Sequence, residues 1–323
     1  MRRGTSGLNL LIAVNKPLGI TSHDAVGRVR RALGERRVGH AGTLDPDASG
    51  VLVMGVGQGT RLMGHLTLDD KGYLARFELG SQTTTDDAEG DELFSAPVPA
   101  EATDEDFARR TVASLVGNHL QVPPAYSAIS VDGRRAYARA RAGEEVELEA
   151  RPITIHEAEL VAVEAGERPV WVARLLVSKG TYVRSIARDL GRELGCGAHL
   201  VGLVRTSSGP IGEAACLTLD EVAELGAGGI TQRALDPVLA VGLAVRALAP
   251  AELADVRCGR QLRAGLVRGV LNPMEPRAPK DGERVCLVVD GRLYGIWQER
   301  AGMLACDANF PDGVAGVRGD WSL

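Results

Sequence analysis

The segment RRVGHAGTLDPDASGVLVMGVGQGTRL, residues 36–62, restricts the fold more than any other part of the chain. Its second half contains GVLVMGV, a short apolar run without charge, which is typical of a buried strand. Directly before this run, Asp45 and Asp47 flank Pro46 among small residues. Because aspartate bonds to its own backbone and proline fixes φ, the sequence predicts a tight turn at the mouth of a buried sheet.

The rest of the chain alternates between strand-like and helix-like patterns. Residues 21–34 have a helix pattern, with Thr21 or Ser22 as the cap and Gly34 as the stop. A second helix is predicted to begin at a cap provided by Thr181 and to end near Gly195. Strands are predicted at LLIAV, GVLVMGV, YLARFELG and VWVARLLVS, and hairpins at Asp132-Gly133 and Asp290-Gly291.

At 323 residues the chain is longer than most single hydrophobic cores, so two domains are expected. Near residue 240 the sequence changes to Ala-, Leu- and Gly-rich stretches, followed by the Pro-rich NPMEPRAPKDG. We therefore predict a larger domain at residues 1–240 and a small β-rich domain at residues 245–323. The predicted fold class is mixed α/β (α+β), with a largely antiparallel sheet flanked by helices. The segment TTTDDAEGDELFSAPVPAEATDEDF is predicted to be an exposed acidic loop.

Several classes of protein are disfavoured by the composition. No run of eighteen apolar residues occurs, so we expect no membrane span. LLIAV is too short for a secretory signal, which favours a cytoplasmic location. The five cysteines form no close pair and the six histidines are dispersed, so neither a disulfide framework nor a metal site is expected.

The charge distribution is more informative than the net charge of −5, which argues against a nonspecific nucleic-acid binder. Residues 1–65 hold nine Lys and Arg against four Asp and Glu, and residues 174–206 hold six against two. Two basic regions in an acidic chain can bind a polyanion locally. Ordinary fluctuation of charge along a chain is an equally good explanation of this pattern.

Taken one at a time, the chemical motifs are weak. Asp45 alone is best explained as a structural turn residue, and His40 alone as a hydrogen-bonded one. GVGQGT lacks the Lys-Ser/Thr of a phosphate-binding loop, so close backbone packing is favoured. In SKGTYVRSIARDLG, Tyr182 and Arg184 are expected in the first helical turn, where free N–H groups suit an anion.

The combination of motifs is far more specific. NKPLGITSHD, RRVGHAGTLDPDASGVLVMGVGQGTRL, DKGYLARFELG, QVPPAYSAI and SKGTYVRSIARDLG occur in this order. Together they resemble the TruB family of tRNA pseudouridine synthases, over roughly residues 9–225. The tail resembles, more weakly, the PUA-like RNA-binding domain of that family. The resemblance makes residues 1–240 the catalytic pseudouridine synthase domain.

The resemblance also assigns roles to individual residues. It places the catalytic aspartate at Asp45 and the histidine that fills the stack vacated by the flipped base at His40. Tyr73 is then expected to stack on that base. The pocket is expected to be lined by Tyr182, Arg184 and Leu203, with the arginine facing the aspartate. The chain departs from the family pattern at Asp47, Ser49 and Val204. Asp47 leaves residue type alone unable to say which acid reacts, although position favours Asp45. Val204 stands in place of an arginine, so one phosphate contact is expected to be missing.

The implied activity is the isomerisation of uridine to pseudouridine at position 55 in the TΨC loop of tRNA. This reaction breaks an N–C glycosidic bond, rotates the base and rejoins it through carbon, so it implies no cofactor. The implied partner is the T-arm stem-loop of tRNA, without a membrane or an obligatory protein partner. Two alternatives stay open: a catalytically silent RNA-binding or tRNA-folding protein, and a base-excising glycosylase.

Overall fold

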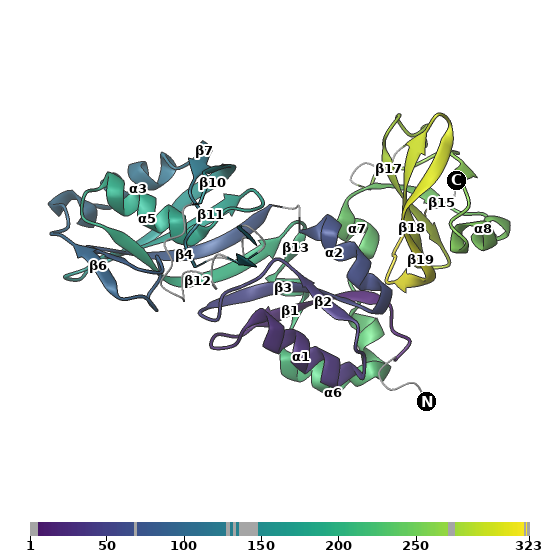
Figure 1. Cartoon of the computed structure of the whole chain (residues 1–323), viewed down its shortest axis with the longest axis horizontal. Coiled ribbons are helices and arrows are strands. Elements are labelled where there is room, and N and C mark those ends of the chain that lie inside the picture. Colours follow the sequence, from purple (N-terminus) through teal and green to yellow (C-terminus); the bar gives the residue numbers. More distant parts are fainter. Residues whose placement is uncertain are drawn as a thin grey trace. The chain divides into compact units, whose positions relative to one another are not determined.

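The computed structural model describes residues 6–67, 70–126, 130–131, 134–135, 148–270, 275–319 and 321. By its contacts the chain divides into two compact units, drawn in Figure 1. The first unit consists of Met1–Leu68 and Ser207–Leu323, and the second of Asp69–Thr206. The predicted turn at residues 132–133 lies outside the described residues, although β8 (Ser130–Val131) and β9 (Arg134–Arg135) on either side pair antiparallel.

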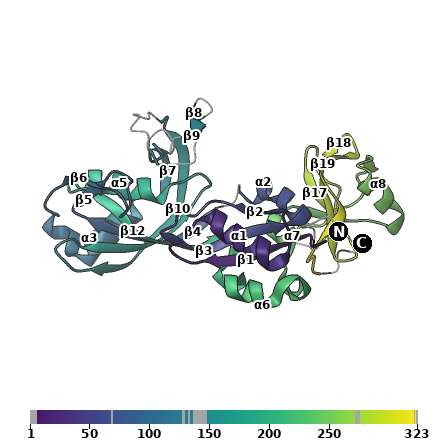
Figure 2. The ribbon, with the colours of Figure 1, turned by 60° about the horizontal axis from the view of Figure 1, so that its bottom comes forward.

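The N-terminal strands of the first unit surround β3, as the apolar run GVLVMGV predicted. β3 (Ala48–Val56) pairs antiparallel with β1 (Leu10–Lys16) and with β2 (Val38–Ala41), while β14 (Cys216–Leu217) runs parallel to β1. Helix α1 (Ser22–Leu33) packs beside α6 (Leu219–Gly229) (Figure 2). The predicted ends of α1 are confirmed, because Thr21 forms a capping box and Gly34 adopts the left-handed conformation.

A separate sheet forms the C-terminal part of the same unit, as predicted. Its order is β15-β17-β18-β19-β16, with only β15 and β17 parallel. Asp290 and Gly291 both have positive φ, at 49° and 68°, and make the predicted hairpin turn. The elements are β15 (Ala244–Ala247), α8 (Leu253–Arg257), β16 (Leu262–Arg263), β17 (Arg284–Val289), β18 (Arg292–Arg300) and β19 (Met303–Ala315).

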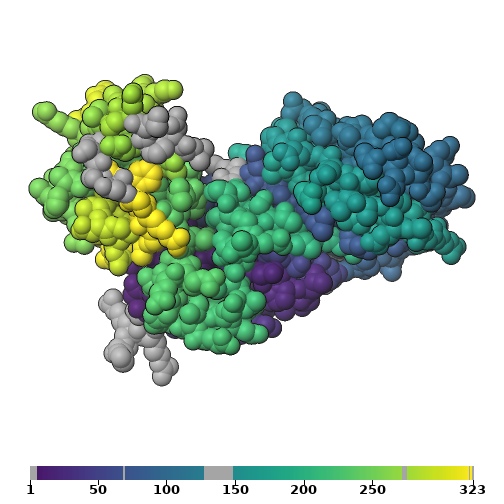
Figure 3. All heavy atoms as spheres, turned by 180° about the vertical axis from the view of Figure 1, so that it is seen from behind, coloured from purple at the N-terminus to yellow at the C-terminus, as the bar shows by residue number. Residues whose placement is uncertain are grey.

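One hydrophobic core runs through both parts of the first unit. It joins Leu11 and Val53 of the N-terminal strands to Val288, Ile296 and Phe310 of the C-terminal sheet. Figure 3 shows the yellow C-terminal strands in direct contact with green residues of this unit. The division into functional domains at residues 240–245 stays a prediction.

The second unit is built on a largely antiparallel sheet, with strand order β12-β4-β11-β10-β7. Trp171 and Phe77 of adjacent strands are fully buried in its core. Helix α5 (Val183–Glu193) approaches β12 so closely that a Cβ at Gly191 would lie 2.0 Å from the Ala198 nitrogen. The other elements are β4 (Lys71–Leu79), α3 (Glu105–Ala113), β7 (Gly117–Gln121), β10 (Arg151–Glu164), β11 (Val170–Val177) and β12 (Ala198–Ser208).

Two predictions in this unit are wrong. The acidic segment is not a simple exposed loop: β5 (Ser81–Thr83) pairs with β6 (Glu92–Ser95), and Asp86 between them is buried. Helix α5 is not capped by Thr181, because Tyr182 occupies the N-cap position without a side-chain cap bond. Tyr182 therefore lies just before the helix, and only Arg184 lies in its first turn.

The predicted fold class is confirmed by these strands and helices. The remaining short elements are α2 (Met63–Leu66), β13 (Ile211–Gly212) and α7 (Pro237–Val241), with 3₁₀ turns at Gly57–Leu62, Ala100–Thr103, Glu213–Ala215, Ile230–Arg233 and Pro250–Glu252. Within the described ranges, no helix has the length and apolar character needed to cross a membrane.

Candidate active site

The turn between β2 and β3 carries Asp45, and its backbone is held from both sides. The Ser22 hydroxyl, at the start of α1, accepts a hydrogen bond from the Leu44 N–H and donates one to the Leu44 carbonyl, both 2.9 Å long. Within the turn, the Ala48 N–H donates to the Asp45 carbonyl over 3.1 Å. A buried polar side chain with both partners satisfied fixes local geometry strongly, so the turn is rigid.

A buried lysine supports the other end of this turn. Lys16, at the end of β1, is 0% exposed, and its ammonium donates to the carbonyls of Pro17 and Ile20, 2.9 and 2.7 Å away. A third donor reaches the Pro46 carbonyl over 3.3 Å. Because Pro46 directly follows Asp45, the Lys16 Nζ lies against the backbone of the turn that presents the acid.

The two acids of this turn differ in exposure. Asp45 is partly buried, whereas Asp47 is exposed to solvent, which favours Asp45 as the residue that a closed site could use. His40 lies in β2 opposite Met54, and its ring meets the ring of His23 edge-on with centroids 5.8 Å apart. Asp45 and His40 therefore belong to one turn and the strand that leads into it.

Four predicted site residues lie in the second unit. Tyr73 is buried in β4 opposite Leu175 of β11, and Leu203 is partly buried in β12. Tyr182 is fixed through its backbone: its N–H donates to the Gln121 side-chain oxygen over 2.9 Å, and its carbonyl accepts from the Gln121 amide over 3.1 Å. These two bonds fix the backbone of the N-cap residue of α5.

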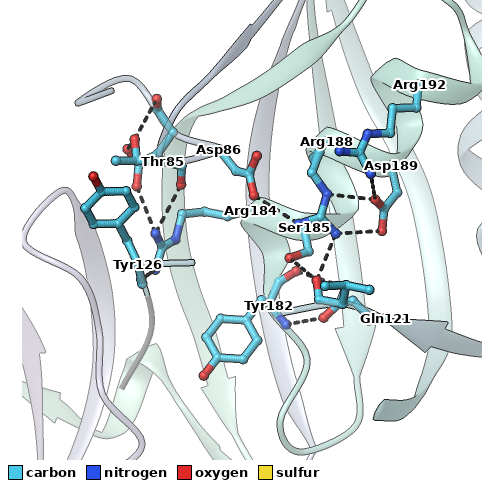
Figure 4. Close-up of polar contacts among 12 residues, drawn as sticks. Thr85, Asp86, Gln121, Tyr126, Tyr182, Arg184, Ser185, Arg188, Asp189 and Arg192 are labelled. Carbon is cyan, nitrogen blue, oxygen red and sulfur yellow. Dashed lines mark hydrogen bonds and ion pairs between the residues drawn. The ribbon is translucent and has the colours of Figure 1, made fainter. Parts of the chain in front are cut away.

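Arg184 is 8% exposed and makes three described contacts. Its guanidinium donates to the Thr85 carbonyl over 3.2 Å and to the Tyr126 carbonyl over 3.0 Å. It also forms an ion pair with Asp87, at 3.4 Å. Figure 4 shows the guanidinium between Thr85 and Tyr126. Sequence reasoning found the arginine but missed Asp87.

A second buried arginine lies one helical turn further along α5. Arg188 pairs with Asp86 over 3.1 Å and with Asp189 over 2.9 Å, and it donates to the Val122 carbonyl over 2.8 Å. Burial is the main influence on Asp86 and raises the pKa of its carboxyl, against the lowering effect of Arg188 and Arg184. The sequence carried no signal for this pair, because Arg188 lies two positions from Ile186, on the opposite side of the helix from its apolar residues.

The six predicted residues thus divide between the two units. Asp45 and His40 lie in the first, and Tyr73, Tyr182, Arg184 and Leu203 in the second. No cluster of three or more His, Cys, Asp or Glu side chains suited to a metal ion is found in the part of the chain that the structure describes.

Comparisons with known proteins identify the family. The model of the TruB family pseudouridylate synthase N-terminal domain matches residues 30–183. The model of the tRNA pseudouridylate synthase B C-terminal domain matches residues 184–241. The two matched ranges contain all six predicted site residues.

Individual relatives agree with these matches. A tRNA pseudouridine synthase B from Thermobifida fusca is 44% identical over 297 residues, covering 90% of this chain and 95% of the relative. One from Cutibacterium acnes is 50% identical over 211 residues, covering 65% and 71%. Among solved structures, the archaeal box H/ACA sRNP Nop10-Cbf5 complex shares the fold, with a TM-score of 0.66 at 23% identity, over 93% of this chain and 85% of that one. The chain belongs to the TruB family of pseudouridylate synthases.

Proposed function

We propose that this chain isomerises uridine to pseudouridine in tRNA, at position 55 of the TΨC loop. The observation that carries the proposal is 44% identity to a tRNA pseudouridine synthase B along 95% of that relative's length. The rigid turn that presents Asp45 agrees with it, since its backbone is fixed by Ser22 and Lys16 before any substrate arrives.

The reaction conserves every atom of the uridine. The N1–C1′ bond breaks, the base rotates, a C5–C1′ bond forms, and a proton is lost from C5 while N1 gains one. Asp45 supplies the carboxylate, which attacks covalently or stabilises an electron-poor intermediate, as carboxylates do in glycoside cleavage. No oxidation or hydrolysis occurs, so the chemistry requires neither a redox cofactor nor a metal ion.

The remaining predicted residues serve base flipping and binding. His40 occupies the space that the flipped base leaves, and Tyr73 stacks on the base in the pocket. Tyr182, Arg184 and Leu203 line that pocket, and the Arg184 guanidinium is held there by its ion pair with Asp87. The burial of Tyr73 and Arg184 supports these roles, because a pocket that excludes water protects the detached base from hydrolysis.

The proposed substrate is the T-arm stem-loop, and the proposed location is the cytoplasm. The C-terminal sheet acts as an RNA-binding element that adds affinity without taking part in the chemistry. The archaeal structural neighbour forms a complex with Nop10, whereas this chain is proposed to act without an obligatory protein partner.

The test is product analysis after incubating the purified chain with an unmodified T-arm stem-loop in the presence of a metal chelator. Pseudouridine at the target position supports the proposal. Unchanged RNA that is nevertheless bound indicates the silent RNA-binding alternative, and abasic RNA indicates a glycosylase. Loss of activity in chelator that a divalent ion restores, with the RNA fold unaffected, contradicts the metal-independent chemistry.

A further inference from the structure

Two arginines of α5 join the same two segments of the second unit. One segment is the turn at residues 85–87, and the other is the stretch at residues 121–126 that continues from β7. Arg184 reaches the first through the Thr85 carbonyl and the second through the Tyr126 carbonyl. Arg184 by itself therefore links the two segments at the N-terminal end of α5.

Arg188 repeats this bridge one turn later (Figure 4). It is 6% exposed and contacts the Asp86 carboxylate in the first segment and the Val122 carbonyl in the second. The Ser185 hydroxyl, between the two arginines, also donates to the Val122 carbonyl, over 3.0 Å. One face of α5 thus contacts both segments at two positions, which are one helical turn apart.

The backbone at Asp86 is fixed as tightly as its side chain. Asp86 has a φ of 61°, in the left-handed region that non-glycine residues seldom adopt. Its carbonyl accepts a hydrogen bond of 3.1 Å from the Leu200 N–H of β12. Because Asp87 is the next residue and pairs with Arg184, any movement of Asp86 displaces the partner of Arg184.

We propose that Asp86 and Arg188 form a positioning pair, which sets the geometry of Asp87 and of the Arg184 guanidinium for the isomerisation. The proposal rests on the proposed function, in which Arg184 belongs to the reaction site. Stability is a poor explanation of this pair, because removing two charges from water offsets most of their mutual attraction. The raised pKa of the Asp86 carboxyl agrees with that cost of burial.

The first test compares Arg188→Gln and Asp86→Asn with the unmodified chain under single-turnover conditions on the T-arm stem-loop. Each variant should lose about tenfold in rate, since small errors in placement are costly to chemistry, while RNA affinity stays within about threefold. Arg109→Gln is the matched control, because it removes exposed ion pairs with Glu105 and Asp106 in the same unit. Its rate should not change.

Arg188→Lys separates an effect on the geometry of the site from an effect on folding stability. It keeps the positive charge but lacks the fork of donors that lets arginine reach both segments at once. We therefore expect nearly the same loss of rate as in Arg188→Gln, with a thermal midpoint closer to that of the unmodified chain. Full rate in Arg188→Lys would overturn the proposal, because a charge alone would then suffice.

A double-mutant cycle with Arg184→Gln tests whether the pair acts through Arg184. If it does, adding Arg188→Gln to Arg184→Gln should slow the reaction by less than about twofold more. Independent, multiplicative losses would overturn the proposal. If Arg184→Gln is slow while the Asp86 and Arg188 variants react at the full rate, the positioning pair is contradicted but the role of Arg184 is not. If Arg184→Gln itself reacts at the full rate, the proposed role of Arg184 is contradicted as well.

Discussion

The turn that carries Asp45 and the buried face of α5 are held in place by different kinds of interaction. Around the turn, the described hydrogen bonds go to backbone groups: the Ser22 hydroxyl bonds to Leu44, and the buried Lys16 side chain donates to carbonyls. On α5, Arg184 pairs with Asp87 and Arg188 with Asp86. These two acids are adjacent residues in a turn that is far from α5 in the sequence. The described support of the turn thus consists of bonds to backbone groups, whereas the α5 face also contains buried arginine–carboxylate pairs.

This difference determines how each region should respond to substitution. In the turn, Ser22 is a small neutral group, so its hydroxyl can be removed without leaving a charge behind. A buried arginine that loses its carboxylate leaves an uncompensated charge, which costs more than the pair contributed. We expect the turn to tolerate changes of charge at its rim, and the α5 face to tolerate few changes of charge at all.

The largest expected effect distinguishes the two acids of the turn. Asp45→Asn keeps the shape of the side chain but removes its charge and most of its nucleophilicity, so the rate should fall by several orders of magnitude. RNA affinity should stay within about tenfold, because binding rests on phosphates and stacking. The exposed Asp47 is the matched control, and Asp47→Asn should retain most activity. A dead Asp47→Asn beside an active Asp45→Asn would reverse the assignment.

The next effect tests how closely α5 must approach β12. In Gly191→Ala the new methyl group would meet the Ala198 nitrogen at 2.0 Å, so we expect a loss of about 3 kcal/mol in unfolding free energy. Gly228→Ala is the control, since nothing lies within 4 Å of its Cβ position. Urea denaturation measures both. Equal stability of the two variants would show that α5 can shift without cost.

A smaller effect concerns the support of the turn. Ser22→Ala leaves the Leu44 N–H and carbonyl without their partner, which should cost about 2 kcal/mol and slow the reaction about tenfold. Thr218→Ala removes an ordinary helix cap from α6 in the same unit, and should cost about 1 kcal/mol without slowing the reaction. If both variants keep the full rate, the turn does not need Ser22 for its geometry.

The smallest effect is a difference in pH dependence between the exposed cap of α1, whose first residue Ser22 contacts the turn, and the buried pair on α5. Hydrogen bonds from the Thr21 hydroxyl and N–H lower the pKa of Asp24, so its stabilising contribution is present at neutral pH and is lost as pH falls through the lowered value. Burial raises the pKa of Asp86, so its contribution is greatest in acid and is lost as pH rises through the raised value.

Urea unfolding between about pH 3 and pH 6 measures both contributions. The stability advantage of the unmodified chain over Asp24→Asn should grow as pH rises. Its advantage over Asp86→Asn should shrink over the same range. Changes in the same direction for both variants would contradict the contrast between an exposed cap and a buried pair.

The sequence predicted those features that depend on neighbouring residues. Thr21, Gly34 and the Asp290-Gly291 turn lie where their local conformational preferences placed them. The cap at Thr181 was wrong because the N-cap position falls one residue later, at Tyr182, whose backbone is bonded by Gln121, 61 residues away in the sequence. No local pattern carries that information.

The buried acids were missed for the same reason. Asp86 and Asp87 stand in a segment with the composition of a solvated loop, and only the fold brings them to arginines about a hundred positions away. The family resemblance supplied six candidate residues by position, but it could not supply their partners in this chain. Those partners are visible only once α5 and the 85–87 turn are seen together.

The most direct test uses a complete unmodified tRNA transcript and maps pseudouridine by mass spectrometry of its nuclease fragments. We expect one pseudouridine per tRNA, in the TΨC loop at position 55, and none with Asp45→Asn at equal protein concentration. Pseudouridine at other positions alone, or the same product from Asp45→Asn, would contradict this expectation.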